Sequence, residues 1–171
     1  YIREINPVVF HYIYYHKKTI LRNIMSIQLS YTHGASNKPL LGTTIGQNLK
    51  ATVQKFPNRE MLVSVHQNYR ATYQEFWDQT TEVAKALIAN GITPGDRIGI
   101  WSHNRYEWVL LQYATARIGT ILVNINPSYR TNELKFALNQ SGVRILFSQL
   151  AFRTSDYRSM VGEVAQYCNE L

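Results

Sequence analysis

The sequence contains a single cysteine, Cys168, among its 171 residues. One cysteine cannot form an internal disulfide or a cysteine-based metal cluster. The lack of disulfides fits a cytosolic or organellar protein better than a secreted one. Because no nearby residue would lower its pKa, we expect Cys168 to pack in the core of the last helix instead of acting as a nucleophile.

Long hydrophobic runs are also missing. No stretch approaches the ~20 apolar residues that a membrane-spanning helix needs, so we expect no transmembrane segment. Charged residues make up 17% of the chain and hydrophobic residues 45%, which is typical of a globular protein and not of a disordered one. The length suits one domain with its own core.

Acidic residues are scarce at the start of the chain. Residues 1–60 hold eight Lys/Arg against Glu4 and Glu60, a net charge of +6, whereas residues 61–171 carry +1. A nucleic-acid interface needs clustered basic residues on a folded surface, with aromatic side chains for stacking. The arginines of the second part are isolated from one another, so we predict no nucleic-acid partner.

Residues 1–29 differ from the rest of the chain. The sequence begins with Tyr1 and not with Met, and Met25 is an alternative start. Residues 1–24 are basic and acid-poor, which loosely resembles a mitochondrial transit peptide, although neither arginine nor serine is enriched. We therefore predict a leader at 1–29, either non-native or a transit peptide, followed by one folded domain at 30–171.

A helix and a β-hairpin are predicted between residues 44 and 72. Thr44 and Gln47 form a capping-box pattern that starts a helix at about 45–55. Strands at 61–65 and 69–72 then pair across a short turn. The apolar stripe of the helix consists of Ile45, Leu49, Val53 and Phe56.

A second capping box, Thr72 with Glu75, begins a longer helix. Gly91 is placed to end it with a left-handed cap, and residues 93–96 form a tight turn. The residues expected on the apolar face of this helix are Phe76, Trp77, Thr80, Val83, Ala84, Leu87 and Ile88.

Strand and helix patterns alternate in the remainder of the chain. Strands are predicted at 97–101, 121–125 and 143–147, and helices at 105–118, 131–140 and 155–169. Asn104, with Glu107, and Thr131 are the expected caps of the first two helices. This alternation predicts an α/β fold, in which a parallel sheet with flanking helices is joined to the β-hairpin.

Motifs that carry chemistry are largely absent. There is no glycine-rich nucleotide loop and no Gly-x-Ser-x-Gly serine, and among the histidines only His11 and His16 have a spacing suited to a metal. The turn at 102–105 follows a strand, where ligands often bind, and Arg105 could there meet an anion. Ordinary helix capping by Asn104 is the favoured alternative.

Several stretches occur in a combination known from one family. They are residues 71–76 (Ala-Thr-Tyr-Gln-Glu-Phe), 91–100 (with Pro-Gly-Asp-Arg), 104–108 (Asn-x-x-Glu-Trp) and 116–134. Together they resemble acyl-CoA synthetases of the adenylate-forming (AMP-binding) superfamily over residues 30–171. Residues 139–142 and 152–157 resemble its medium-chain branch.

The resemblance implies a two-step reaction. A fatty acid and ATP–Mg²⁺ form an acyl-adenylate and pyrophosphate, and coenzyme A then displaces AMP to give the thioester. In the family this chemistry resides in a phosphate loop and in later segments that would follow Leu171. Residues 31–39 resemble that loop only superficially, because Asn37 replaces a glycine and Leu40 a lysine.

The resemblance therefore predicts no catalytic, cofactor-binding or metal-binding residue in this chain, and no tight binding of ATP, Mg²⁺ or CoA by it alone. Asn124 and Tyr129, at the end of a strand, are candidates for indirect support of the site. The glycines and the proline that match family turns are Gly91, Gly95, Gly119 and Pro127.

Two alternatives to an inactive part of a fatty acid–CoA ligase remain. The chain could be a non-catalytic binding or interaction module with the same core, or a flavodoxin-like nucleotide binder. The leader favours a mitochondrial location, with a cytoplasmic or peroxisomal one as alternatives. The sequence gives no indication of oligomeric state.

Overall fold

The computed structural model describes residues 34, 37–38 and 40–171. The predicted leader, with His11 and His16, and most of residues 31–39 lie outside the described residues. The helices are α1 (Ile45–Lys55), η1 (Val65–Gln67, a 3₁₀ turn), α2 (Tyr73–Ala89), α3 (Tyr106–Arg117), α4 (Thr131–Ser141) and α5 (Tyr157–Ala165). The strands are β1 (Glu60–Ser64), β2 (Tyr69–Thr72), β3 (Arg97–Trp101), β4 (Ile121–Ile125), β5 (Ile145–Ser148), β6 (Ala151–Phe152) and β7 (Ser155–Asp156).

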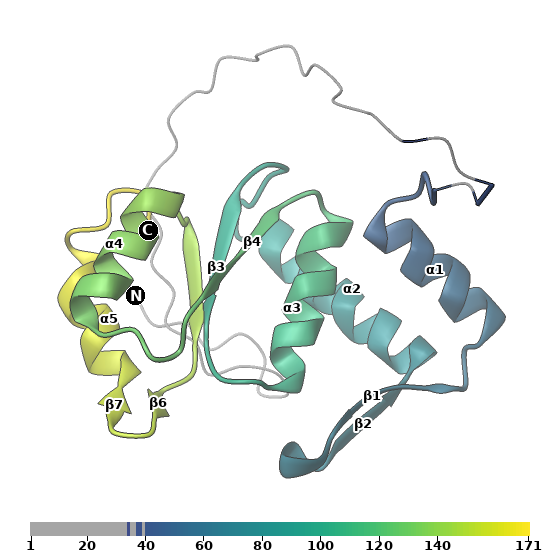
Figure 1. The fold of residues 1–171 in the computed structure, drawn as a ribbon, viewed down its shortest axis with the longest axis horizontal. Coiled ribbons are helices and arrows are strands. Elements are labelled where there is room, and N and C mark those ends of the chain that lie inside the picture. The colour runs from purple at the N-terminus through teal and green to yellow at the C-terminus, as the bar shows by residue number, and fades with distance from the viewer. Residues whose placement is uncertain (1–33, 35–36, 39) are drawn as a thin grey trace.

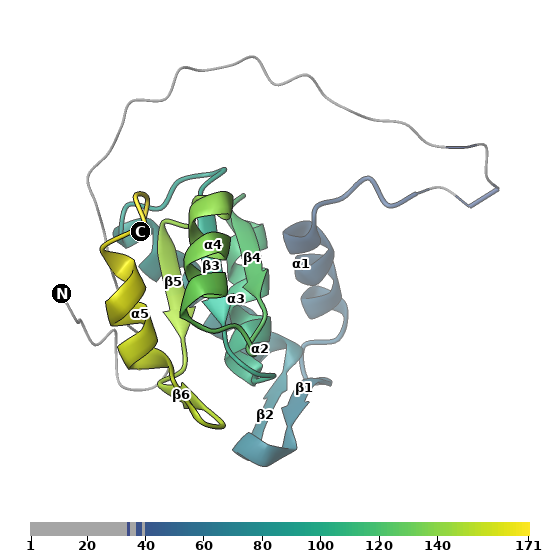
Figure 2. The same cartoon turned by 60° about the vertical axis from the view of Figure 1, so that its left-hand side comes forward.

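A parallel sheet of order β4-β3-β5 forms the centre of the fold. Helices α2 and α3 cover one face of this sheet, and α4 and α5 cover the other (Figures 1 and 2). The antiparallel β1–β2 hairpin lies beside the α2–α3 layer together with α1 (Figure 1). The predicted α/β architecture with its added hairpin is thereby confirmed.

The central strand β3 divides its side chains between the two helix layers. Ile98 and Ile100 belong to the core on the α2–α3 side, whereas Trp101 belongs to the core on the α4–α5 side. All three are at most 1% exposed. Gly99 lies on the α4–α5 side, where a Cβ atom would come within 3.0 Å of Val143 and 3.1 Å of Leu146.

A third apolar cluster joins α1 and the hairpin to the rest. Leu49 and Val53 of α1 pack with Phe76 of α2 and Leu110 of α3. The capping boxes predicted at the starts of α1 and α2 are both present. The close contact of α1 with α3 depends on Gly46, because a Cβ there would lie 3.0 Å from a side-chain carbon of Arg117.

Two predicted helix caps were wrong. Helix α3 begins after Arg105 and not after Asn104, and its N-cap side chain makes no capping hydrogen bond. Helix α4 begins after Arg130, so Thr131 is its first helical residue. In α4 the carboxylate of Glu133 accepts a hydrogen bond from the Arg130 N–H, which satisfies one of the free N–H groups at the helix start without a Ser/Thr cap.

The remaining corrections concern burial and element bounds. Ile45 and Ile88 were expected on buried stripes, but each is 57% exposed; Ile45 is the first residue of α1 and Ile88 the last but one of α2. The third strand begins at Ile145, two residues later than predicted. The last helix begins at Tyr157, after the small β6–β7 hairpin of residues 151–156, and it ends at Ala165 instead of at residue 169.

An ion pair between Asp96 and Arg144 joins the starts of β3 and β5. The Asp96 carboxylate, before β3, accepts hydrogen bonds from Arg144, before β5, and from the N–H and hydroxyl of Thr93. Burial alone would raise the pKa of Asp96, but these hydrogen bonds and the arginine charge outweigh it and lower the pKa. Deprotonated Asp96 therefore stabilises the fold.

We expect Gly99→Ala to destabilise the protein by about 1–3 kcal/mol, because the added methyl group overpacks the core against Val143 and Leu146. The matched control is Gly162→Ala on the exposed side of α5, where a Cβ meets nothing within 4 Å. It should stabilise the helix by about 0.5–1 kcal/mol. Denaturant unfolding measures both, and two changes of the same sign would contradict the packing described for β3.

We expect Asp96→Asn to lower the free energy of unfolding by about 1–2 kcal/mol at neutral pH. The carboxyl has a folded-state pKa below its ordinary value of 3.8, so its contribution is complete above that pH and is lost as the pH falls below it. The difference between wild type and variant should shrink in acid. The same substitution at the exposed Asp78 is the control. A pH-independent difference for Asp96→Asn would contradict the stabilising role of the Asp96 charge.

Candidate functional site

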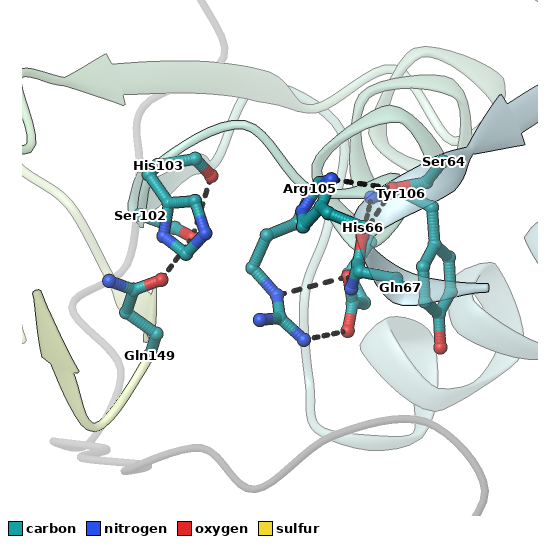
Figure 3. A network of polar contacts seen from close by, with 9 residues as sticks. Ser64, His66, Gln67, Ser102, His103, Arg105, Tyr106 and Gln149 are labelled. Carbon is teal, nitrogen blue, oxygen red and sulfur yellow. Dashed lines mark hydrogen bonds and ion pairs between the residues drawn. The ribbon is translucent and has the colours of Figure 1, made fainter. Parts of the chain in front are cut away.

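The turn after β3 meets the tip of the β1–β2 hairpin at the carboxyl edge of the sheet (Figure 3). Residues 102–105 leave β3 for α3, while the connections after β4 and β5 lead to α4 and α5 on the opposite face (Figures 1 and 2). In α/β sheets, ligands bind where neighbouring strands send their connections to opposite faces. This edge is therefore the candidate functional site.

A buried carboxylate organises one half of the site. The side chain of Glu107 is 8% exposed, and it accepts hydrogen bonds from the Arg105 guanidinium at 2.8 and 3.2 Å. The Gln67 Nε2 amide, from the hairpin tip, donates to the same carboxylate at 2.8 Å. Because Glu107 neutralises Arg105, the arginine charge is directed into the protein.

Gln67 supplies the cap that the α3 sequence lacks. Its Oε1 accepts a hydrogen bond of 2.8 Å from the backbone N–H of Tyr106, the first residue of α3. The Ser64 hydroxyl also donates to this oxygen at 2.9 Å, and the rings of Tyr69 and Tyr106 stack with centroids 3.8 Å apart. The Arg105 guanidinium and the Tyr106 N–H, which could have met an anion here, thus already have protein partners.

His103, in the same turn, has its ring between those of His66 at the hairpin tip and Phe152 of β6. Its ring stacks on Phe152 at 5.4 Å between centroids, and its buried Nδ1 has no hydrogen-bond partner. The neighbouring Ser102 hydroxyl is 3.2 Å from Oε1 of Gln149, which follows β5. The His66 ring lies 6.1 Å from the His103 ring. The turn therefore bridges the hairpin tip and the end of β5 (Figure 3).

Aromatic stacking holds the connections after β4 and β5 against the sheet. The Trp101 and Tyr157 rings stack at 3.5 Å, and the Trp101 Nε1 donates to the Asn126 carbonyl at 2.9 Å. The Tyr157 hydroxyl donates to the Pro127 carbonyl. Burial raises the pKa of Tyr157 to about 12, although the nearby Arg130 charge opposes this shift. The hydroxyl therefore remains protonated and keeps this contact at physiological pH.

The residues singled out from the sequence are not all gathered here. Asn124 is an exposed residue of β4, and Tyr129 lines a shallow groove on α4 with Phe136, so neither contacts the Glu107 cluster. Cys168 is buried in the α4–α5 core, as expected, and burial raises the pKa of its thiol. Gly91, Gly95 and Gly119 all have positive φ angles, as turn positions require.

Within the described part of the chain, no three His, Cys, Asp or Glu residues come together as metal ligands would. None of the helices described there combines the length and the apolar character that crossing a membrane requires.

Sequence reasoning missed Gln67 and His66. Residues 66–68 were expected only to turn the chain between two strands, and the α3 residues that Gln67 contacts, Tyr106 and Glu107, lie 39 and 40 residues away in the sequence. No local pattern signals a contact of that kind. No missing cap was evident from the sequence either, because Asn104, an ordinary cap residue, directly precedes position 105.

A family model described as AMP-binding enzyme matches residues 49–168. The mitochondrial medium-chain acyl-CoA ligase ACSF2 of Danio rerio is 40% identical over 149 residues, which cover 87% of this chain and 24% of that protein. This chain thus spans about a quarter of the length of the curated relatives that it matches.

Solved structures of other proteins have a similar fold. The N-terminal domain of FACL13 from Mycobacterium tuberculosis, with a bound inhibitor, has a TM-score of 0.62 and 25% identity over 72% of this chain and 29% of its own. The Mycobacterium tuberculosis fatty acyl CoA synthetase has a TM-score of 0.60 and 28% identity, over 61% of this chain and 21% of that one.

We expect Gln67→Ala to cost about 1–3 kcal/mol, because it leaves the Tyr106 N–H without an acceptor and removes a donor from buried Glu107. Amide exchange at Tyr106 should accelerate accordingly. Gln74→Ala removes only an exposed contact to Asp78 and is the matched control. Equal effects of the two substitutions would show that the hairpin tip does not hold α3.

Proposed function

This chain belongs to the AMP-binding enzyme family, and we propose that it forms the N-terminal part of an ATP-dependent medium-chain acyl-CoA ligase. The observation that carries the proposal is the 40% identity to a medium-chain acyl-CoA ligase over 87% of this chain. The parallel sheet and the order of its helices support the same assignment, because the similar solved structures include a fatty acyl CoA synthetase.

In the proposed reaction, a fatty acid carboxylate attacks the α-phosphorus of ATP, with Mg²⁺ as the metal, and pyrophosphate leaves. The CoA sulfur then attacks the acyl carbon of the adenylate, and AMP leaves as the thioester forms. Such chemistry depends on positioning and on stabilising charge in the transition state. We propose that the groups performing it belong to segments other than this chain, which contributes none of them.

This chain contributes turns that are held in place at the carboxyl edge of the parallel sheet. Glu107 fixes Arg105 and Gln67, and Trp101 stacks on Tyr157, so that the turns after β3 and β4 keep their shape at the carboxyl edge of the sheet. A site held by such buried contacts positions a ligand more precisely than a loop alone does.

We also propose an organisation and a location for the whole protein. Residues 1–29 would be a leader, either non-native or a transit peptide, and residues 30–171 the beginning of the AMP-binding domain. A mitochondrial location is supported by the basic, acid-poor composition of residues 1–24 and by the relative's name, since that ligase is called mitochondrial.

The proposal can be tested with a chimera. Residues 30–171 of this chain would be joined to the part of the Danio rerio ligase that follows its matching region. Thioester formation from a medium-chain fatty acid, ATP and CoA should approach that of the intact Danio rerio ligase, whereas the 171-residue chain alone should release no pyrophosphate. A chimera that folds but stays inactive would favour the alternative, a non-catalytic interaction module.

The ligase proposal and the interaction-module alternative predict different solution behaviour for the isolated chain. Ile121 on the edge strand β4 is 49% exposed, and Phe136 on α4 is 65% exposed, as expected where further parts of a domain pack. We expect the apparent mass of the isolated chain to rise above 19.8 kDa with concentration in light scattering. Ile121→Lys should reduce the rise, and a monodisperse monomer at all concentrations would support the module.

A further inference from the structure

Arg130 connects two loops at the carboxyl edge of the sheet. It follows β4 and precedes α4, and its guanidinium reaches the tip of the β6–β7 hairpin. There its Nη1 donates to the Ser155 hydroxyl at 3.0 Å and its Nη2 to the Thr154 hydroxyl at 3.4 Å. Figure 1 shows the β4–α4 connection passing beside this hairpin.

These contacts leave three donor groups without an anionic acceptor: the Arg130 guanidinium and the hydroxyls of Thr154 and Ser155. The two hydroxyl oxygens accept from Arg130, but neither hydroxyl donates its own proton to another described residue. Arg130 forms no ion pair within the described part of the chain, in contrast to Arg105 and Arg144, which pair with Glu107 and Asp96. Arg130 and Thr154 are exposed, so a solute can reach them.

Among the described residues, neither of the nearby carboxylates forms an ion pair with Arg130. Glu133 accepts a hydrogen bond from the backbone N–H of Arg130, and Asp156 accepts one from the backbone N–H of Ser159. Arg153, which directly precedes Thr154 in sequence, adds a second positive charge to this turn. Arg153 adopts a φ of 52°, an uncommon conformation for a residue other than glycine, at the turn that presents Thr154 and Ser155.

We propose that Arg130, Thr154 and Ser155 bind the phosphate group of a phosphate monoester. The guanidinium would donate two N–H groups to the phosphate oxygens, and each hydroxyl would rotate from accepting to donating. Guanidinium forks match phosphate geometry, and charge-assisted hydrogen bonds are the stronger kind. The site is distinct from the Glu107 cluster, and it does not depend on the proposed ligase activity.

The test uses the whole chain and the probe glycerol 3-phosphate, with glycerol and equimolar chloride as controls. Titration followed by amide and arginine NMR signals should give saturable shifts confined to residues 128–131 and 152–156. Arg130→Gln keeps hydrogen-bond donors but removes the charge, and it should weaken binding at least about tenfold. Thr154→Val, which leaves the arginine intact, should weaken it by a smaller factor.

Arg158→Gln is the matched control, because this exposed arginine, unlike Arg130, donates no hydrogen bond to either hydroxyl. It should bind the probe within about twofold of wild type. The proposal is overturned if glycerol produces the same shifts, if the shifts do not saturate, or if Arg158→Gln loses as much affinity as Arg130→Gln. Retained chemical-shift dispersion in each variant shows that the fold is intact.

Discussion

Strand β3 can lie at the centre of the sheet only if both of its faces are filled and both of its edges are paired. Ile98 and Ile100 fill one face, Trp101 fills the other, and β4 and β5 pair with the two edges. Gly99 completes this arrangement because its missing side chain lets Val143 and Leu146 approach the strand. Each helix layer therefore finds an apolar surface on β3, and the two layers are coupled through it.

The candidate site inherits its rigidity from this strand. The turn at 102–105 leaves directly from β3, so its starting point is fixed by the core. Its far end is fixed by Glu107, whose buried charge is acceptable only because Arg105 and Gln67 both donate to it. The hairpin tip that carries Gln67 thereby becomes part of the sheet edge, although it belongs to a separate two-stranded sheet.

Local patterns predicted most of the fold because they report directly on local energetics. Thr44 with Gln47 and Thr72 with Glu75 satisfy helix N–H groups within four residues, so their capping boxes could be recognised without any tertiary information. The start of α3 was predicted wrongly for the opposite reason. Its first N–H is satisfied by Gln67, 39 residues earlier in the sequence, and no local rule detects such a contact.

The same limit applies to exposure and to the new anion site. Periodicity placed Ile45 and Ile88 on apolar stripes, but it does not report how wide the neighbouring surface is, and both side chains remain exposed. The β6–β7 hairpin has strands of only two residues, too short for an alternating pattern. Its pairing, and therefore the meeting of Arg130 with Thr154 and Ser155, became evident only from the fold.

Native-state hydrogen exchange tests most directly whether β3 couples the two helix layers. If it does, the slowest amides of β3, α3 and α4 all exchange with one free energy, equal to that of global unfolding, because neither layer can open without exposing the strand. If the amides of α4 exchange with a distinctly lower free energy while those of β3 and α3 stay protected, the layers are independent, and the account given for the fold and its site is contradicted.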